Sequence, residues 1–195
     1  MTTMSWVPED RAPRAHEERA VAARKGLLII YTGDGKGKTT AALGLVFRAL
    51  GRNYRVAIVQ FIKGQWKTGE AAMAKTLADR MDFFVMGDGF TWDTKNYEQD
   101  VASARRAWAK CLELLADDRY QLVIFDELSY VIKYNFLSVD EVLEGLKRKP
   151  PRTHVVITGR DAPPALLEAA DLVTEMREIK HPYQAGMKAQ PGIDY

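Results

Sequence analysis

A short glycine-rich segment holds the residues of this chain that are best suited to bind phosphate. Residues 32–40 read Thr-Gly-Asp-Gly-Lys-Gly-Lys-Thr-Thr, so glycines alternate with charged residues before a Lys-Thr pair. Glycines let successive backbone N–H groups turn toward phosphate oxygens, and the lysine adds positive charge. In such a loop Lys38 reaches the phosphates and the hydroxyl of Thr39 holds a divalent metal ion. The segment therefore predicts a binding loop for a nucleoside triphosphate.

The residues on either side of this loop predict the elements that position it. Residues 27–31 are apolar and predict a buried strand, and residues 41–47 predict a helix that ends near Gly51. A helix that begins at the loop directs its free N–H groups and its positive end toward a bound anion. Strand, glycine loop and helix in this order are the context that a P-loop requires.

The loop departs from the usual P-loop pattern in two details. That pattern places a glycine five residues before the Gly-Lys pair, where this chain has Thr32. In addition, Asp34 carries a negative charge close to the expected phosphates. That charge repels phosphate unless Lys36 or a metal ion offsets it.

A second chemical feature is the pair Asp126 and Glu127, which follows the apolar residues 122–125. In P-loop proteins a carboxylate at the end of such a strand lies beside the loop and supports the metal ion. One carboxylate of the pair would then hold Mg²⁺ while the other activates a water; the alternative is two solvated residues that cap the next turn. The pair supports nucleotide and Mg²⁺ binding but does not name the reaction, because many chemistries share this scaffold.

Strand and helix signals alternate along the rest of the chain. Further strands are predicted at residues 54–61, 83–86, 122–125, 154–158 and 171–176, and further helices at residues 70–80, 100–115, 138–147 and 165–170. The helix at 138–147 begins with Ser138 and Glu141 at capping-box spacing. Apolar strands separated by helices indicate a mainly parallel sheet with helices on both faces. We therefore predict an α/β fold of the P-loop NTPase-like (RecA-like) kind, with a single nucleotide-binding domain at residues 26–195 and an N-terminal extension at residues 1–25.

Composition narrows the functional classes. The 195 residues are 47% hydrophobic and 28% charged, as expected of an ordinary globular chain. The longest apolar runs are too short to span a bilayer, and the polar N-terminus does not resemble a signal peptide. A single cysteine, Cys111, excludes an internal disulfide and fits a reducing cytoplasm. The net charge of +2 is too small to argue for nucleic acid. We expect a cytoplasmic protein with neither a membrane nor a nucleic acid as partner.

Parallel strands bring the loops at their carboxyl ends to one edge of the sheet, where ligands bind. Four predicted loops meet there, at residues 32–40, 63–70, 86–96 and 158–160. The third contains Phe90 and Trp92, which either fold into the core or form an apolar wall for a large flat ligand such as a macrocycle or a base. In the fourth loop, Arg160 is either a surface arginine or a clamp for phosphate.

Six segments in this order resemble the P-loop type of ATP:corrinoid adenosyltransferase, and the resemblance covers residues 26–195. The segments are residues 32–40, 59–64 (Val-Gln-Phe-Ile-Lys-Gly), 89–92 (Gly-Phe-Thr-Trp), 126–128 (Asp-Glu-Leu), 157–160 (Ile-Thr-Gly-Arg) and 188–195. The resemblance implies that Co(I) of a reduced corrinoid attacks the 5′ carbon of ATP and releases triphosphate. The product would be adenosylcobalamin or an adenosylated corrinoid precursor. The metal ion bound with ATP would be Mg²⁺ or Mn²⁺.

The resemblance also implies roles for individual residues. Those that would bind the nucleotide are Gly33, Asp34, Gly35, Lys36, Gly37, Lys38, Thr39, Thr40 and Arg160, and those that would hold the metal ion are Thr39, Asp126 and Glu127. Phe90 and Trp92 would displace the lower axial base of the corrinoid, so that they join Lys38 and Glu127 as catalytic residues. Asp34 stands where the family has asparagine, which leaves its contact with nucleotide open.

Partners and assembly follow from the same resemblance. It implies an electron-donor protein such as a flavodoxin or flavin reductase, and a homodimer. It also implies an N-terminal lid over the site, for which residues 12–25 are the candidate segment.

Two other functions are compatible with the residues alone. One is a P-loop ATPase or small-molecule kinase in which Glu127 activates water or a hydroxyl, although the Arg-rich lid expected of a kinase is missing. The other is a nucleotide-dependent module that binds single-stranded nucleic acid through Lys63, Lys67 and the aromatic residues, against which the near-neutral charge argues. The product released from ATP distinguishes these functions. A transferase releases triphosphate, a kinase releases ADP, and an ATPase or a nucleotide-dependent module releases ADP with phosphate.

Overall fold

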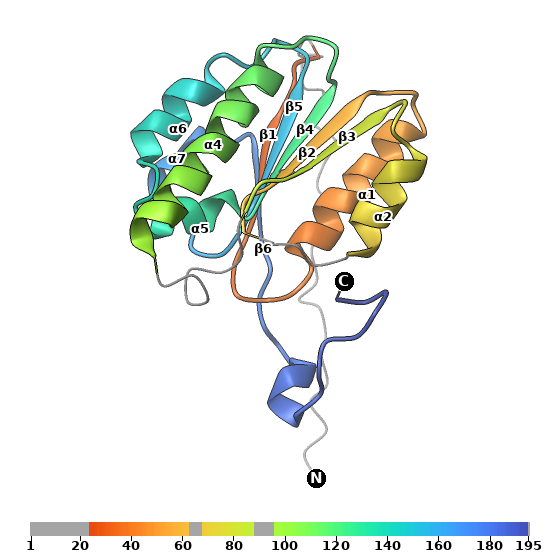
Figure 1. The fold of residues 1–195 in the computed structure, drawn as a ribbon, viewed down its shortest axis with the longest axis vertical. Coiled ribbons are helices and arrows are strands. Elements are labelled where there is room, and N and C mark those ends of the chain that lie inside the picture. The colour runs from red at the N-terminus through yellow and green to blue at the C-terminus, as the bar shows by residue number, and fades with distance from the viewer. Residues whose placement is uncertain (1–23, 63–67, 88–95, 195) are drawn as a thin grey trace, which may run out of the picture.

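Six parallel strands form the centre of the molecule (Figure 1). The computed structural model describes residues 24–62, 68–87 and 96–194. The strands are β1 (Leu28–Thr32), β2 (Val56–Gln60), β3 (Met81–Val85), β4 (Leu122–Asp126), β5 (His154–Thr158) and β6 (Leu172–Glu175). They lie in the order β3-β2-β4-β5-β1-β6, and every pairing between them is parallel. The predicted α/β class with a parallel sheet is confirmed.

Helices cover both faces of this sheet, as Figure 1 shows. One face carries α1 (Lys38–Leu50) and α2 (Gly69–Thr76), and the other carries α4 (Tyr97–Leu115), α5 (Leu128–Lys133), α6 (Val139–Leu146) and α7 (Pro164–Ala169). Because the strands are parallel, each connecting helix returns the chain to the same starting edge. All the loops that follow strands therefore meet at the opposite, carboxyl edge.

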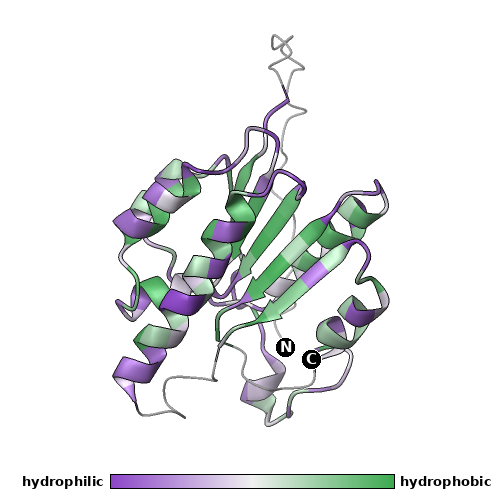
Figure 2. Cartoon of the chain, turned by 45° about the horizontal axis from the view of Figure 1, so that its top comes forward, coloured by the Kyte–Doolittle hydropathy of each residue, from purple (hydrophilic) through white to green (hydrophobic). Residues whose placement is uncertain are grey.

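Two apolar cores, one on each face, hold the layers together. Successive residues of β4 alternate between them: Val123 and Phe125 pack with the helix α4 side, and Leu122 and Ile124 pack with the α1 side. On the α4 side, the ring of Trp108 meets Phe125 edge to face with 6.0 Å between centroids. Figure 2 shows the outcome, with apolar strands between helices whose polar residues face outward. Burial on both faces explains why the strands read as continuous apolar runs.

Most predicted elements are observed, with boundaries that shift by a few residues. The capping residue Ser138 accepts the backbone N–H of Glu141 at 3.1 Å, as its spacing predicted. The helix α2 ends at Thr76 and is therefore shorter than predicted. The six-residue helix α5 was missed because it is too short to display a helical period. Within the described ranges, no helix combines the length and the apolar character needed to cross a membrane.

Candidate nucleotide-binding site at the carboxyl edge of the sheet

The phosphate loop joins β1 to α1 at the carboxyl edge and encloses a lysine. Gly33 and Gly37 adopt positive φ angles of 95° and 111°, which glycine tolerates best. Lys38, the first residue of α1, is only 7% exposed. Its Nζ donates to the carbonyl oxygens of Gly33 at 2.8 Å and Gly35 at 2.7 Å. Burial lowers the pKa of Lys38, and the negative charge of Glu127 opposes that shift.

Two of the loop glycines are required by a neighbouring segment. After β6 the chain runs along the loop: Met176 N–H donates to Thr32 O, and Gly35 N–H donates to Met176 O, both at 2.7 Å. A Cβ at Gly33 would lie 2.4 Å from Met176 O, and one at Gly35 would lie 2.7 Å from Arg177 O. This close approach gives a packing reason for glycines at these two positions.

A buried carboxylate, Asp126, organises the ends of three strands. Asp126 is 1% exposed at the end of β4, and its Oδ1 accepts the hydroxyls of Thr39 at 2.8 Å and Thr158 at 2.7 Å. Its Oδ2 accepts Nε2 of Gln60 at 3.0 Å. Hydrogen bonds to an ionised acceptor are stronger than neutral ones, which suits a buried carboxylate. The strand-end carboxylate therefore lies beside the phosphate loop, as its place in the sequence predicted.

The next residue, Glu127, adopts a conformation that is rare for side chains other than glycine. Its φ is +66°, in the left-handed region, where strain is typical of functional sites. Its N–H donates to the Thr158 hydroxyl at 2.9 Å, the same hydroxyl that donates to Asp126. Thr158 thus orders two adjacent carboxylate residues at once.

A cavity of about 610 Å³ opens above these groups. Its lining includes eight predicted site residues: Gly35, Lys36, Gly37, Lys38, Thr39, Thr40, Glu127 and Arg160. Lysine, arginine and the amino end of α1 make this wall suited to an anion. Asp126 lies behind the lining, bonded to Thr39.

Three predicted site residues that the structure describes are not part of this lining: Gly33, Asp34 and Asp126. Gly33 belongs to the loop but accepts from Lys38, and Asp34 lies exposed. Phe90 and Trp92 lie outside the described residues.

The oxygen donors at the cavity are suited to Mg²⁺. Mg²⁺ is usually held by one or two protein oxygens together with water and substrate phosphates. The hydroxyl of Thr39 and the carboxylate of Glu127 line the cavity and are donors of this kind. Among the described residues, no group of three or more His, Cys, Asp or Glu side chains could hold a metal ion. A site of few protein ligands completed by nucleotide phosphates is the arrangement that this donor set permits.

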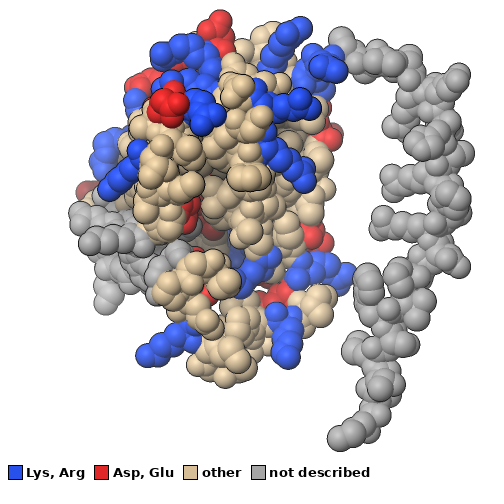
Figure 3. Space-filling model, turned by 90° about the vertical axis from the view of Figure 1, so that its right-hand side faces the viewer, with Lys and Arg blue, Asp and Glu red and all other residues tan. Residues whose placement is uncertain are grey.

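The C-terminal segment forms a further wall of the cavity. After β6 the chain descends below the sheet, forms the 3-10 helix η1 (Pro182–Ala185) and returns toward α1 (Figure 1). His181, Gly192, Ile193 and Asp194 line the cavity, and Asp194 forms an ion pair with Lys36 of the phosphate loop. In the space-filling view, charges of both signs gather where this C-terminal segment, at the bottom, meets the rest of the molecule (Figure 3). The tail has no regular period, so the residues alone assigned it no role at this site.

Comparison with known proteins identifies the family. The family described as ATP:corrinoid adenosyltransferase BtuR/CobO/CobP matches residues 24–195. The chain belongs to this family. A corrinoid adenosyltransferase from Sinorhizobium sp is 46% identical over 187 residues, which cover 93% of this chain and 87% of that protein. A corrinoid adenosyltransferase from Pseudomonas aeruginosa is 43% identical over 189 residues, or 97% of this chain and 90% of that protein.

A solved structure supports the fold of this adenosyltransferase family member. The flagellar accessory protein FlaH from Methanocaldococcus jannaschii superimposes with a TM-score of 0.54. The match covers 78% of this chain and 71% of that one, at 16% sequence identity. At this identity the likeness concerns the fold alone.

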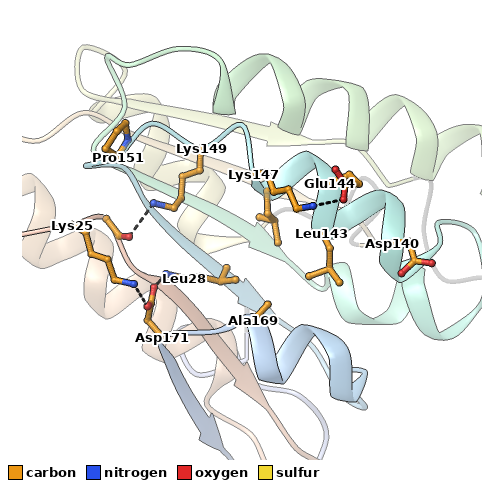
Figure 4. Close-up of a pocket in the computed structure, with 12 residues that line it drawn as sticks. Lys25, Leu28, Asp140, Leu143, Glu144, Lys147, Lys149, Pro151, Ala169 and Asp171 are labelled. Atoms are coloured by element: carbon orange, nitrogen blue, oxygen red, sulfur yellow. Dashed lines mark hydrogen bonds and ion pairs between the residues drawn. The ribbon is translucent and has the colours of Figure 1, made fainter.

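A second cavity, of about 710 Å³, lies at the amino edge of the same sheet (Figure 4). The first residue of β1, the residue before β6, the last residue of α7 and much of α6 border it, together with the loop that leads to β5. Its three lysines bond to the protein itself: Lys25 pairs with Asp171, Lys147 pairs with Glu144, and Lys149 donates to Gly26 O at 2.9 Å. None of the predicted site residues that the structure describes lines this cavity.

Proposed function

We propose that this chain transfers the adenosyl group of ATP to the cobalt of a reduced corrinoid, with the triphosphate held in the carboxyl-edge cavity. Family membership over residues 24–195 carries the reaction, and the phosphate loop with Lys38 and Thr39 supports the nucleotide site. The names of the two relatives, both corrinoid adenosyltransferases, favour this reaction over an ATPase, a kinase or a nucleic-acid module.

The reaction exchanges one bond for another. The electron pair of Co(I) forms a bond to the 5′ carbon of ATP, and the bond from that carbon to the triphosphate oxygen breaks. The electrons of the broken bond leave with the triphosphate, and the cobalt becomes formally Co(III). The protein's largest electrostatic task is therefore to stabilise the charge on the departing triphosphate.

The cavity holds the groups for that task. The ammonium of Lys38 is held inside the phosphate loop, where it would contact the phosphates in exchange for its two carbonyl acceptors. Lys36 and Arg160 line the same cavity and would contact other oxygens of the triphosphate. Fixed charges in a partly enclosed site stabilise a leaving anion without reorganising when the bond breaks.

A divalent metal ion, Mg²⁺ or Mn²⁺, would neutralise part of the triphosphate charge when bound. In this proposal the Thr39 hydroxyl and the Glu127 carboxylate hold it. Asp126 accepts from Thr39 at 2.8 Å and would orient that hydroxyl.

The corrinoid side of the proposal rests on the family. Phe90 and Trp92 would displace the lower axial base of the corrinoid. A protein donor such as a flavodoxin or flavin reductase would supply the electron that reduces the cobalt.

Domain organisation is part of the same proposal. Residues 1–25 would form an extension whose segment 12–25 closes over the site, while residues 26–195 form the nucleotide-binding domain. A cytoplasmic homodimer completes the proposal, and contact of Asp34 with nucleotide remains a prediction.

One anaerobic experiment tests the reaction. The protein is incubated with ATP, Mg²⁺ and chemically reduced cob(I)alamin while the visible spectrum and the phosphate products are followed. Adenosylcobalamin with an equal amount of triphosphate is the expected result. An unchanged spectrum with accumulation of ADP would instead favour the ATPase or kinase.

A further inference from the structure

The last residues of the described chain lie against the phosphate loop. Residues 176 and 177 brace the backbone of Gly33 and Gly35 from one side. Gly192, Ile193 and Asp194 then return to line the cavity itself. The C-terminal segment therefore contacts the loop twice, once through its backbone and once through the side chain of Asp194.

The carboxylate of Asp194 is oriented by its own segment. Its Oδ2 accepts the N–H of Gln190 at 2.8 Å, and Asp194 N–H donates to Gln190 O at 2.9 Å. These two bonds close a turn over residues 190–194, which holds the carboxylate in place. Its Oδ1 pairs with Nζ of Lys36, and the Asp194 side chain is 15% exposed against 47% for Lys36. The carboxylate is thus the more fixed member of the pair.

We propose that Asp194 is a positioning residue for nucleotide binding: it holds Lys36 at the cavity wall and makes residues 190–194 part of the triphosphate site. A lysine has a long flexible side chain with three N–H donors. The carboxylate occupies one donor and leaves the others for phosphate. A side chain already held in place loses less conformational entropy when the ligand binds. The inference rests on the proposed role of Lys36 in binding triphosphate.

The test is the binding of ATP, and separately of inorganic triphosphate, measured by calorimetry for matched variants. Asp194→Asn keeps an acceptor for Gln190 N–H but removes the charge that holds Lys36. We expect about fivefold weaker binding of both ligands, the upper end of what a partly exposed ion pair contributes. In turnover the KM for ATP should rise while kcat stays near that of the parent, and Asp194→Glu should restore part of the affinity.

A double-mutant cycle separates positioning from general damage. In a Lys36→Ala background, Asp194→Asn should cause no further loss, because the side chain that it positions is gone. Asp117→Asn is the matched control, since Asp117 pairs with Arg119 at 2.6 Å on another part of the surface. The affinity of this variant for ATP should equal that of the parent protein.

Three outcomes would overturn the inference. Tighter binding by Asp194→Asn would mean that the carboxylate competes with phosphate for Lys36. An equal loss in the Lys36→Ala background would mean that Asp194 acts only through the fold. Unchanged binding by Lys36→Ala itself would remove the role of Lys36 from the proposed function, a failure distinct from the other two.

Discussion

The two cavities of this molecule have similar volumes, about 610 and 710 Å³, and lysines line both, yet they lie at opposite edges of the sheet. At the carboxyl edge, the amino ends of α1 and α2 face the cavity, and Lys38 is the first residue of α1. At the amino edge, the cavity is lined by the last residue of α7 and by α6 from Asp140 to its last residue, Leu146, which Lys147 follows.

The difference follows from the direction of the chain in a parallel sheet. Every crossover begins at the carboxyl edge, where the free N–H groups and the positive dipole end of its first helix favour an anion. Every crossover returns to the amino edge, where the free carbonyls at the end of its last helix favour a cation. Lysines at both edges bond to acceptors of the protein, but only those at the carboxyl edge, Lys36 and Lys38, lie beside the free N–H groups of a helix start that favours an anion.

Lys38→Met is the change with the largest expected effect, because it removes the cation from the phosphate loop while keeping much of the stem. We expect adenosyl transfer to fall by at least about 100-fold, as when a preorganised group that stabilises developing charge is removed. The rate of adenosylcobalamin formation and the affinity for ATP are the measurements, with thermal unfolding as the check on folding. A variant with the affinity and rate of the parent would contradict the role given to the loop.

Asp126→Asn sharpens the contrast, since it disturbs the network behind the carboxyl-edge cavity alone. The amide group places a donor where Asp126 now accepts from Thr39, Thr158 or Gln60. Groups that orient metal ligands typically contribute 10- to 100-fold, so we expect a loss of about that size in Mg²⁺ affinity. Activity measured against Mg²⁺ concentration tests it. Thr158→Val removes one donor to Asp126 and the acceptor of the Glu127 N–H but keeps the Asp126 carboxylate, so its effect should be smaller, and the reverse order would contradict this account.

Lys149→Met is the counterpart of Lys38→Met at the amino edge. Lys149 donates to Gly26 O, so its loss should reduce the free energy of unfolding by about 1 kcal/mol, the net worth of one hydrogen bond. The rate of adenosyl transfer should remain that of the parent. Urea denaturation and the cobalamin assay measure the two effects. A loss of activity as large as that of Lys38→Met would erase the distinction between the edges.

The smallest expected effect is a pH dependence at the amino edge. Burial, and secondarily the charge of Lys149, lowers the pKa of His154, whose Nδ1 accepts the N–H of Leu27 at 3.1 Å. Because the folded state disfavours the proton, the contribution of His154 to stability is present above its unfolded pKa of about 6.5 and is lost as the pH falls toward the folded value. Urea denaturation measures the free energy of unfolding at pH 7.5 and at pH 5. Between these two pH values the parent should lose more of that free energy than His154→Asn, whose side chain can still accept the N–H of Leu27. Equal losses would show that His154 does not cause the dependence.

The fold was largely predictable because its signals are local. Each strand is a short apolar run, and Ser138 caps its helix within three residues. Tertiary contacts decided what such patterns miss. The helix α5 begins directly after Glu127, whose left-handed conformation no pattern in the sequence indicates.

The arrangement of residues at the proposed site was predictable to the same extent. Lys38, Thr39 and Asp126 follow from the loop and from a carboxylate at the end of a strand. Gln60 and Thr158 were missed as partners of Asp126, although each is a single polar residue that ends an apolar strand. That signal gains meaning only when the strand order places β2 and β5 on either side of β4.

The sequence by itself determined the phosphate loop, the alternation of strands and helices, and the family resemblance, because each depends on residues close together along the chain. Only the tertiary structure decided that Met176 and Arg177 require glycines at 33 and 35, and that Asp194 meets Lys36. These pairs lie more than a hundred residues apart in the chain. Packing of β6 against β1 brings Met176 and Arg177 to the loop, and the return of the C-terminal segment brings Asp194 to Lys36; no local pattern encodes either arrangement.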